Sequence, residues 1–164
     1  MDVRASTAGD RSDLETFLGR HHALRVARRG ELVDCLEHPA FLARSDDGLV
    51  GVATYVVGDE AWELLTLHAS RRFGGIGSAL VTAVAEAARS AGCSRVRVVT
   101  TNDNVDALRF YQRRGFRLVE LRPGAVDESR RALKPEIPEA GAYDIALRDE
   151  LELELRLDRQ AASL

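Results

Sequence analysis

The middle of the chain changes from a strand-like apolar pattern to a helical one across a short glycine-rich stretch. Trp62 to His68 is an apolar run with aromatic and β-branched members and the length of a strand. The Ala-rich stretch from Ser78 to Ala91 follows, and the apolar positions at helical spacing are Ile76, Leu80, Val81, Val84 and Ala88. Between these stretches lie three glycines and two arginines. The pattern predicts a strand, a tight turn and a helix.

The N-terminal third predicts a strand, two short helices and a hairpin. Val3 to Thr7 is a short strand, and Asp10 or Ser12 caps a helix that runs to about Gly19. Arg20 to Gly30 is basic and ambiguous, and Glu31 to Leu36 is expected as a second short helix that ends near Pro39. Ala40 to Arg44 and Leu49 to Val57 flank Ser45-Asp46-Asp47-Gly48, an Asp-Gly hairpin signal.

The C-terminal part adds strands and one more helix. Arg95 to Thr100 alternates as a strand does, a helix begins after Asn104 and ends by Gly115, and Phe116 to Leu121 is a strand. Arg122 to Gly141 has no clear periodicity. Glu150 to Leu157 alternates strictly, which predicts a final strand with one solvent-facing side that could supply a sheet edge.

This order of elements predicts an α/β (α+β) fold. Hairpins first and a strand–helix pattern later imply a mixed, mostly antiparallel central sheet of about seven strands with helices on both faces. The length of 164 residues suits one domain, 1–164. We find no internal repeat, low-complexity tract or inter-domain linker.

Composition narrows the classes of partner. The net charge of −3 offers no overall basic field, so neither nucleic acid nor an anionic membrane is expected as a partner. No apolar leader and no apolar run long enough to span a membrane is visible. Cys35 and Cys93 are far apart and are expected to be reduced. These features predict a cytoplasmic protein.

The glycine-rich turn suits a phosphate. A helix start presents backbone N–H groups and partial positive charge, and glycine lets a phosphate approach the backbone. A P-loop is excluded because no Lys follows, and a Rossmann fingerprint is excluded because Leu80 stands where its third Gly or Ala would be. What remains is Arg72-x-x-Gly75-x-Gly77, which is also compatible with a purely structural turn.

Two motifs in order resemble the GNAT superfamily of N-acetyltransferases. The first is similar to its Arg/Gln-x-x-Gly-x-Gly/Ala loop, which binds the pyrophosphate of acetyl-coenzyme A. The second motif follows the first after one helix and one strand, and it resembles the superfamily's Asn-x-x-Ala-x-x-x-Tyr-x-x-x-Gly-Phe. It reads Asn104-Val105-Asp106-Ala107-Leu108-Arg109-Phe110-Tyr111-Gln112-Arg113-Arg114-Gly115-Phe116. The order of expected elements also resembles the GNAT topology.

The resemblance implies acetyl-coenzyme A as co-substrate, with no metal. It implies that Leu67 and His68 present backbone groups to the pantetheine arm from a bulged strand. The other coenzyme-binding positions that it implies are Arg72, Phe73, Gly74, Gly75, Ile76, Gly77, Ser78, Asn104, Ala107 and Tyr111. Phe73 departs from the commoner small residue, which affects the fine geometry of the loop. Asn104 also stands at an N-cap position.

The resemblance also places Tyr111 as general acid. A phenol with a pKa of about 10 can protonate a thiolate with a pKa of about 8.5, although Tyr111 could simply be a core aromatic residue. The general base stays open between Glu63, His68 and a water-relayed base. By strict alternation Glu63 and His68 lie on opposite faces of their strand. His21, His22 and His38 have no metal-ligand spacing.

The sequence therefore predicts a transferase that moves an acetyl group from acetyl-coenzyme A directly to a small-molecule or peptide amine. Acceptor specificity is expected in Arg20 to Leu36 and Arg122 to Tyr143, since long loops in a compact domain are usually functional. The alternatives are a non-catalytic acetyl-coenzyme A sensor or interaction module on the same fold, and a nucleotide-phosphate binder that uses the same turn. A homodimer is possible.

Overall fold

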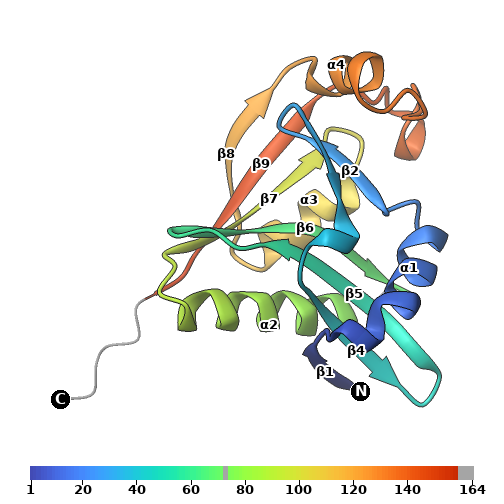
Figure 1. Cartoon of the computed structure of the whole chain (residues 1–164). Helices are drawn as coiled ribbons and strands as arrows, with labels where there is room; N and C mark the ends of the chain where they lie inside the picture. Colours follow the sequence, from blue (N-terminus) through green and yellow to red (C-terminus); the bar gives the residue numbers. More distant parts are fainter. Residues whose placement is uncertain (72–73, 159–164) are drawn as a thin grey trace. The chain divides into compact units, whose positions relative to one another are not determined.

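A computed structural model describes residues 1–71 and 74–158 of the chain. Its seven-stranded sheet has the order β1-β4-β5-β6-β7-β9-β8, and a separate two-stranded sheet pairs β2 with β3. The strands are β1 (Asp2–Ala5), β2 (Arg25–Arg28), β3 (Glu31–Asp34), β4 (Ala40–Ser45), β5 (Gly48–Val56), β6 (Ala61–Ala69), β7 (Arg95–Thr101), β8 (Arg117–Arg122) and β9 (Glu150–Arg156). The helices are α1 (Arg11–Arg20), α2 (Ile76–Ser90), α3 (Val105–Arg113) and α4 (Ala125–Ala132) (Figure 1). The expected mixed α/β fold is confirmed.

The chain divides into two compact units, which we describe separately. The first consists of Met1–Leu24, Asp34–Val96 and Arg156–Leu164, and the second of Arg25–Val33 and Arg97–Leu155.

The first unit is an antiparallel run of strands with a helix on each face. β1 pairs with β4, β4 with β5, and β5 with β6, all antiparallel. The predicted hairpin is present, with Gly48 at a φ of 98° directly after the turn. α2 runs along β5 and β6 (Figure 1), and its buried face is made by Ile76, Leu80, Val81, Val84, Ala85 and Ala88. This stripe follows the helical spacing read from the sequence.

Gly51 in β5 sets how closely α2 approaches the sheet. A Cβ atom at this position would overlap the side chain of Ile76, the first residue of α2, and would lie 3.0 Å from Leu80 Cδ1. The absence of a side chain therefore lets the start of α2 rest directly on β5. Because the glycine-rich turn leads into this helix, Gly51 also fixes where the turn ends.

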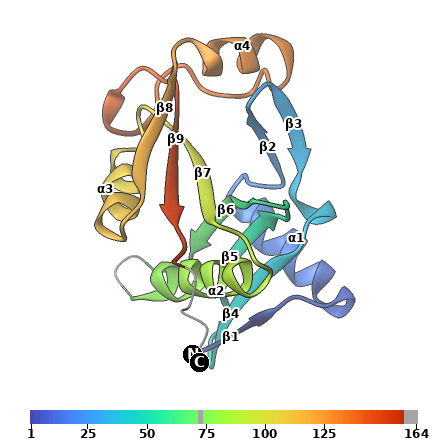
Figure 2. The same ribbon diagram turned by 90° about the vertical axis from the view of Figure 1, so that its left-hand side faces the viewer.

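The second unit contains β8, β9, α3, α4 and the turn between β2 and β3. β8 and β9 pair antiparallel, and a register shift between Leu118 and Glu120 leaves one extra residue in β8. β9 lies beside β8 in both views, and α4 lies near the β2–β3 turn (Figures 1 and 2). Lys134 Nζ donates to Arg25 O at 2.8 Å, which ties the segment after α4 to the start of β2.

The predicted helix over residues 31–36 is wrong. Glu31–Asp34 is strand β3, and only the short 3-10 turn Cys35–Glu37 is helical. Arg29 and Gly30 both have positive φ, 53° and 76°, which reverses the chain as in a two-residue type I′ hairpin turn. The basic segment before the turn therefore pairs with the stretch that sequence spacing favoured as helix.

Two predictions about the C-terminal region also need correction. Arg122 to Gly141 contains helix α4, whose inward positions Val126 and Ser129 are three residues apart. β9 does not have one solvent-facing side, because Glu150 and Glu152 are only 2% and 5% exposed. The edge strands of the sheet are β1 and β8, and β9 lies inside it. The homodimer stays a prediction.

Candidate functional site

The turn before α2 has the geometry that a phosphate-binding turn needs. Gly75 is the N-cap residue, with a φ of 74°, and open space surrounds the position of a Cβ atom there. The first intrahelical hydrogen bond runs from Ala79 N to Gly75 O at 3.0 Å. The N–H groups of Ile76 and Gly77 precede this bond, at the end of the helix that carries partial positive charge. Arg72 and Phe73 lie outside the described residues.

The strand that leads into the turn carries a bulge. In the register with β5, Thr66 lies opposite Thr54, whereas Leu64 lies opposite Tyr55. Leu65 is therefore an extra residue in β6. The resemblance implied a bulge whose exposed backbone groups are those of Leu67 and His68. The irregularity in the β5–β6 ladder comes two residues earlier than Leu67.

The bulge places Glu63 and His68 on the same face of β6, so the prediction from strict alternation is wrong. Glu63 lies opposite Val56 and His68 opposite Val52, and these two valines share one face of β5. The extra residue at Leu65 shifts the alternation by one position. Both candidate bases thus face the same side, and Glu63 is 2% exposed.

His68 lies against the ring of His21, the residue that directly follows α1. Its ring stacks on His21 with centroids 4.8 Å apart, and His21 in turn lies 4.7 Å from Phe17. Burial, with a smaller contribution from the nearby His21, lowers the pKa of His68 to about 4. His68 is therefore neutral at physiological pH and can accept a proton, but it is a weak base.

The motif around α3 begins and ends a helix. Asn104 Oδ1 accepts a hydrogen bond from Ala107 N at 3.2 Å, so the Asn-x-x-Ala spacing is that of an N-cap and its partner. At the other end Gly115 has a φ of 90°, and Phe116 N donates to Tyr111 O at 3.1 Å. This arrangement is a Schellman motif, which is frequently accompanied by an apolar contact between its two ends.

That contact is the packing of Tyr111 on Phe116. The two rings are 5.1 Å apart, and Phe110 meets Tyr111 edge-to-face at 5.2 Å. Tyr111 is 6% exposed. Burial raises the pKa of Tyr111 well above its usual range, opposed in part by the charge of Arg114. The phenol therefore stays protonated at all physiological pH values.

The site residues predicted from the sequence fall in both units. The glycine turn and the β6 residues belong to the first unit, and Asn104, Ala107 and Tyr111 belong to the second.

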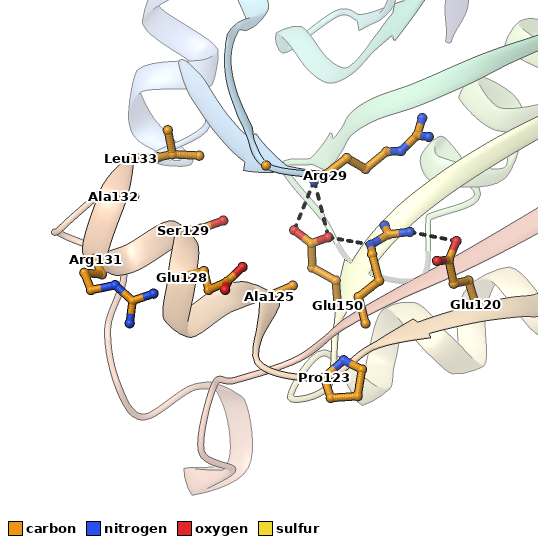
Figure 3. Close-up of a pocket in the computed structure, with 12 residues that line it drawn as sticks. Arg29, Glu120, Pro123, Ala125, Glu128, Ser129, Arg131, Ala132, Leu133 and Glu150 are labelled. Atoms are coloured by element: carbon orange, nitrogen blue, oxygen red, sulfur yellow. Dashed lines mark hydrogen bonds and ion pairs between the residues drawn. The ribbon is translucent and has the colours of Figure 1, made fainter.

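Within the second unit, the two segments expected to determine acceptor specificity line one cavity. It has a volume of about 590 Å³ and takes Arg29 and Gly30 from the β2–β3 turn and residues of α4 from the later segment (Figure 3). Glu150 also lines the cavity. The sequence analysis missed this residue because the alternating pattern of residues 150–157 predicted that its glutamates face solvent. The pairing that explains the burial, between Arg122 and Glu150 at the ends of adjacent antiparallel strands, is a property of the fold.

Among residues 1–71 and 74–158, no group of three or more His, Cys, Asp or Glu side chains is arranged to hold a metal ion. Within the same part of the chain, no helix has both the length and the apolar character needed to span a membrane.

Residues 10–116 match the family model described as "Acetyltransferase (GNAT) family". The chain belongs to the GNAT acetyltransferase family. This match covers the predicted glycine turn and the whole second motif. The superfamily suggested by two short motifs is thereby confirmed.

This GNAT chain is similar to several known proteins. It is 38% identical over 140 residues to the uncharacterized protein YdhI of Bacillus subtilis, covering 84% of this chain and 87% of YdhI. A GNAT family acetyltransferase from Elizabethkingia anophelis, solved with acetyl-CoA bound, has a TM-score of 0.68 at 20% identity, with 95% and 97% of the two chains covered. The ribosomal-protein-alanine N-acetyltransferase of Brucella melitensis has a TM-score of 0.68 at 20% identity, with 96% of this chain and 100% of that chain covered. At these identities the two structures show a shared fold.

Proposed function

We propose that this GNAT protein is an N-acetyltransferase that transfers an acetyl group from acetyl-coenzyme A directly to an amine, with Tyr111 as general acid. The observation that carries the proposal is the turn at Gly75. Its left-handed backbone starts a helix of 15 residues whose first N–H groups face outward, as an anionic pyrophosphate requires. The acetyl-CoA bound in the Elizabethkingia structure supports the same donor here.

In this proposal Ile76 and Gly77 hold the pyrophosphate through backbone N–H groups, together with Arg72. Backbone groups of β6 near Leu67 bind the pantetheine arm and provide a donor to the developing oxyanion. Tyr111 donates its proton to the departing thiolate. Glu63, His68 or a water held by them removes the proton from the amine, and both side chains lie on the same face of β6.

The acceptor is proposed to be a small molecule or a peptide amine. The later loop carries carboxylates and guanidinium groups alike, so the residue types alone favour neither sign of charge on the acceptor. One protein with the same fold is named a ribosomal-protein-alanine N-acetyltransferase, so we retain peptide amines among the proposed acceptors.

A sensor that binds acetyl-coenzyme A without turnover is the second candidate, and one observation favours it. Burial raises the pKa of Tyr111, so its proton is harder to give to a thiolate with a pKa of about 8.5 than that of an ordinary phenol. If bound substrate changes the surroundings of the hydroxyl, the enzyme reading holds. If it does not, Tyr111 is a packing residue.

Calorimetric titration with acetyl-coenzyme A and, in parallel, with adenosine diphosphate tests the donor. We expect clear binding of acetyl-coenzyme A and far weaker binding of the diphosphate, because only the former has a pantetheine arm for β6. Thiol release from acetyl-coenzyme A across a library of amines then separates enzyme from sensor. Equal binding of both ligands would favour a nucleotide-phosphate binder, and no binding of acetyl-coenzyme A would contradict the proposal.

A further inference from the structure

The edge strand β8 exposes a group of apolar side chains. It lies at the outside of the seven-stranded sheet, where its neighbour is β9 (Figure 1). Leu118, Val119 and Leu121 are 49%, 51% and 57% exposed, and among the described residues no other strand carries more than one large apolar side chain of this exposure. A strand edge flanked by exposed apolar side chains is a surface on which a further strand can pair.

The bulge in β8 sorts its apolar and charged side chains onto two faces. Leu118 and Leu121 lie opposite leucines of β9, whereas Arg117 and Glu120 lie opposite glutamates. Leucines and glutamates alternate along β9 and therefore occupy its two faces, which opposite residues of β8 share. The extra residue, Val119, brings Arg117 and Glu120 to the same face although they are three positions apart.

Two charges on that face have capacity for a further partner. Arg117 is exposed and makes no hydrogen bond or ion pair with any residue of 1–71 or 74–158. The side chain of Glu120 is 56% exposed. Its Oε2 accepts from Arg122 Nη1 at 3.0 Å, and its Oε1 has no hydrogen-bond partner in the described part of the chain. One strand edge thus offers a donor and an acceptor of opposite charge, which a second copy of the same strand can match.

Two-fold symmetry restricts how two antiparallel β8 strands can pair, because every contact then occurs twice. With the axis between Leu118 and Val119, Arg117 of each copy lies opposite Glu120 of the other. Both side chains belong to the same face, as opposite residues must. The two residues at the bulge also face their counterparts, Leu118 opposite Val119, so the ladder stays in step on both sides of the axis.

The neighbouring registers fit less well. An axis through Val119 would set Arg117 opposite Leu121, which belongs to the other face of β8. An axis between Val119 and Glu120 would set Arg117 opposite Arg122, and like charges directly opposite each other are destabilising. The charge pattern of this edge therefore favours a second copy of the chain as its occupant, in one register.

We propose that β8 pairs antiparallel with β8 of a second copy about the axis between Leu118 and Val119, and so forms a homodimer. Two ion pairs between Arg117 and Glu120 fix the register, and the exposed apolar side chains beside the axis become covered. This interface is independent of the proposed acetyl transfer. It is measured without acetyl-coenzyme A, so its failure and the failure of the proposed function are separate results.

The test is sedimentation velocity of the full chain over a range of concentrations. We expect the wild-type chain to form a dimer. Arg117→Glu should weaken dimerisation at least roughly tenfold, because like charges then face each other at both contacts. Glu120→Arg should have the same effect, and Arg122 keeps its ion pairs with Glu150 and Glu152 in that variant. A wild-type chain that stays monomeric at high micromolar concentration would overturn the proposal.

A mixture of the two single variants tests the register itself. In a heterodimer of Arg117→Glu with Glu120→Arg, one chain carries two acids and the other two arginines at these positions, so both contacts are attractive again. We expect the mixture to dimerise although each variant alone is monomeric. Circular dichroism confirms that both are folded. Arg20→Glu, the same reversal at an exposed arginine of α1, should leave the dimer unchanged. A folded mixture that stays monomeric would overturn the register.

The apolar part of the interface has its own pair of variants. Leu118→Asp should weaken dimerisation at least roughly tenfold, because it places a carboxylate beside the axis in both copies. Val57→Asp, which changes an apolar side chain that is 58% exposed and lies outside β8, should leave the dimer at wild-type strength. A dimer that withstands Leu118→Asp and both charge reversals would place the contact elsewhere and refute the proposal.

Discussion

The turn before α2 and the segment around α3 carry motifs of similar length, but the structure uses them differently. Around α3, Asn104 caps the helix start, and Gly115 with Phe116 ends it. Most of that motif therefore has a structural reason. At the turn, Gly75 adopts a left-handed conformation beside open space and leads to outward N–H groups. Motif spacing thus encodes a helix boundary around α3, whereas at the turn before α2 it matches the ligand-binding surface that we propose.

The hydroxyl of Tyr111 is the one feature of the α3 motif that packing leaves unexplained. Its ring is accounted for by the contact with Phe116 that completes the helix end. Phenylalanine would make the same contact. The strongest test of the comparison is therefore to remove the hydroxyl and keep the ring.

Tyr111→Phe should lower kcat roughly 100-fold, the usual contribution of a general acid, while the melting temperature and the affinity for acetyl-coenzyme A stay at wild-type values. Steady-state thiol release and calorimetry measure these. Tyr55→Phe, which removes the hydroxyl of another buried tyrosine, is the matched control. Unchanged turnover in Tyr111→Phe would make the whole α3 motif structural.

Gly51→Ala tests whether the turn depends on the seating of α2. The added methyl group would meet Ile76 at the first residue of the helix, so we expect a loss of about 1–3 kcal/mol in the free energy of unfolding and weaker binding of acetyl-coenzyme A. Gly9→Ala is the control, because the nearest atom to its Cβ position is Thr7 Oγ1 at 3.7 Å. Wild-type affinity in a destabilised Gly51→Ala would show that the turn keeps its geometry independently of β5.

The His68 environment predicts a pH-dependent stability for the first unit. The folded pKa of about 4 lies below the unfolded value of 6.5, so between these values the unfolded chain binds more protons. The contribution of His68 to the free energy of unfolding is fully present above pH 6.5 and is lost progressively as the pH falls toward 4. Urea unfolding at pH 7.5 and pH 5 should differ by about 1–2 kcal/mol from this group.

Two histidine variants test whether His68 causes the difference in stability between pH 7.5 and pH 5. His68→Gln should abolish most of this difference, since it removes the titrating group. His22→Asn should retain it, because His22 is exposed and asparagine tolerates its φ of 54°. A difference that survives in His68→Gln would assign the pH dependence to other groups. Asp10 is not a candidate, because its lowered pKa places its contribution below the range compared.

The sequence was sufficient for the sheet and for the helices with regular apolar spacing, such as α2. It failed where a single backbone event changed the meaning of the pattern. Leu65 as an extra residue brought Glu63 and His68 to one face. Positive φ at Arg29 and Gly30 made a hairpin from a segment read as helix. Neither event has a strong local signature, because both depend on pairing with other strands.

The prediction of a solvent-facing side for β9 failed for a different reason, which concerns its glutamates. Alternating glutamates usually mark a solvent-facing side, yet Glu150 and Glu152 are buried because Arg122 on the neighbouring strand pairs with both. Such compensation is a tertiary property. Residues from both segments expected to determine acceptor specificity line one cavity, and their role in acceptor binding stays a prediction.

Asn104→Ala gives the smallest effect and the finest distinction between the two motifs. Loss of the bond from Ala107 N to Asn104 Oδ1 should cost about 1 kcal/mol of stability, and we expect the affinity for acetyl-coenzyme A to stay unchanged. Asn104→Asp retains a capping oxygen and should restore stability. Because the coenzyme is anionic, weaker binding in Asn104→Asp would show that this side chain also faces the ligand, and the α3 motif would then combine a helix boundary with a binding surface.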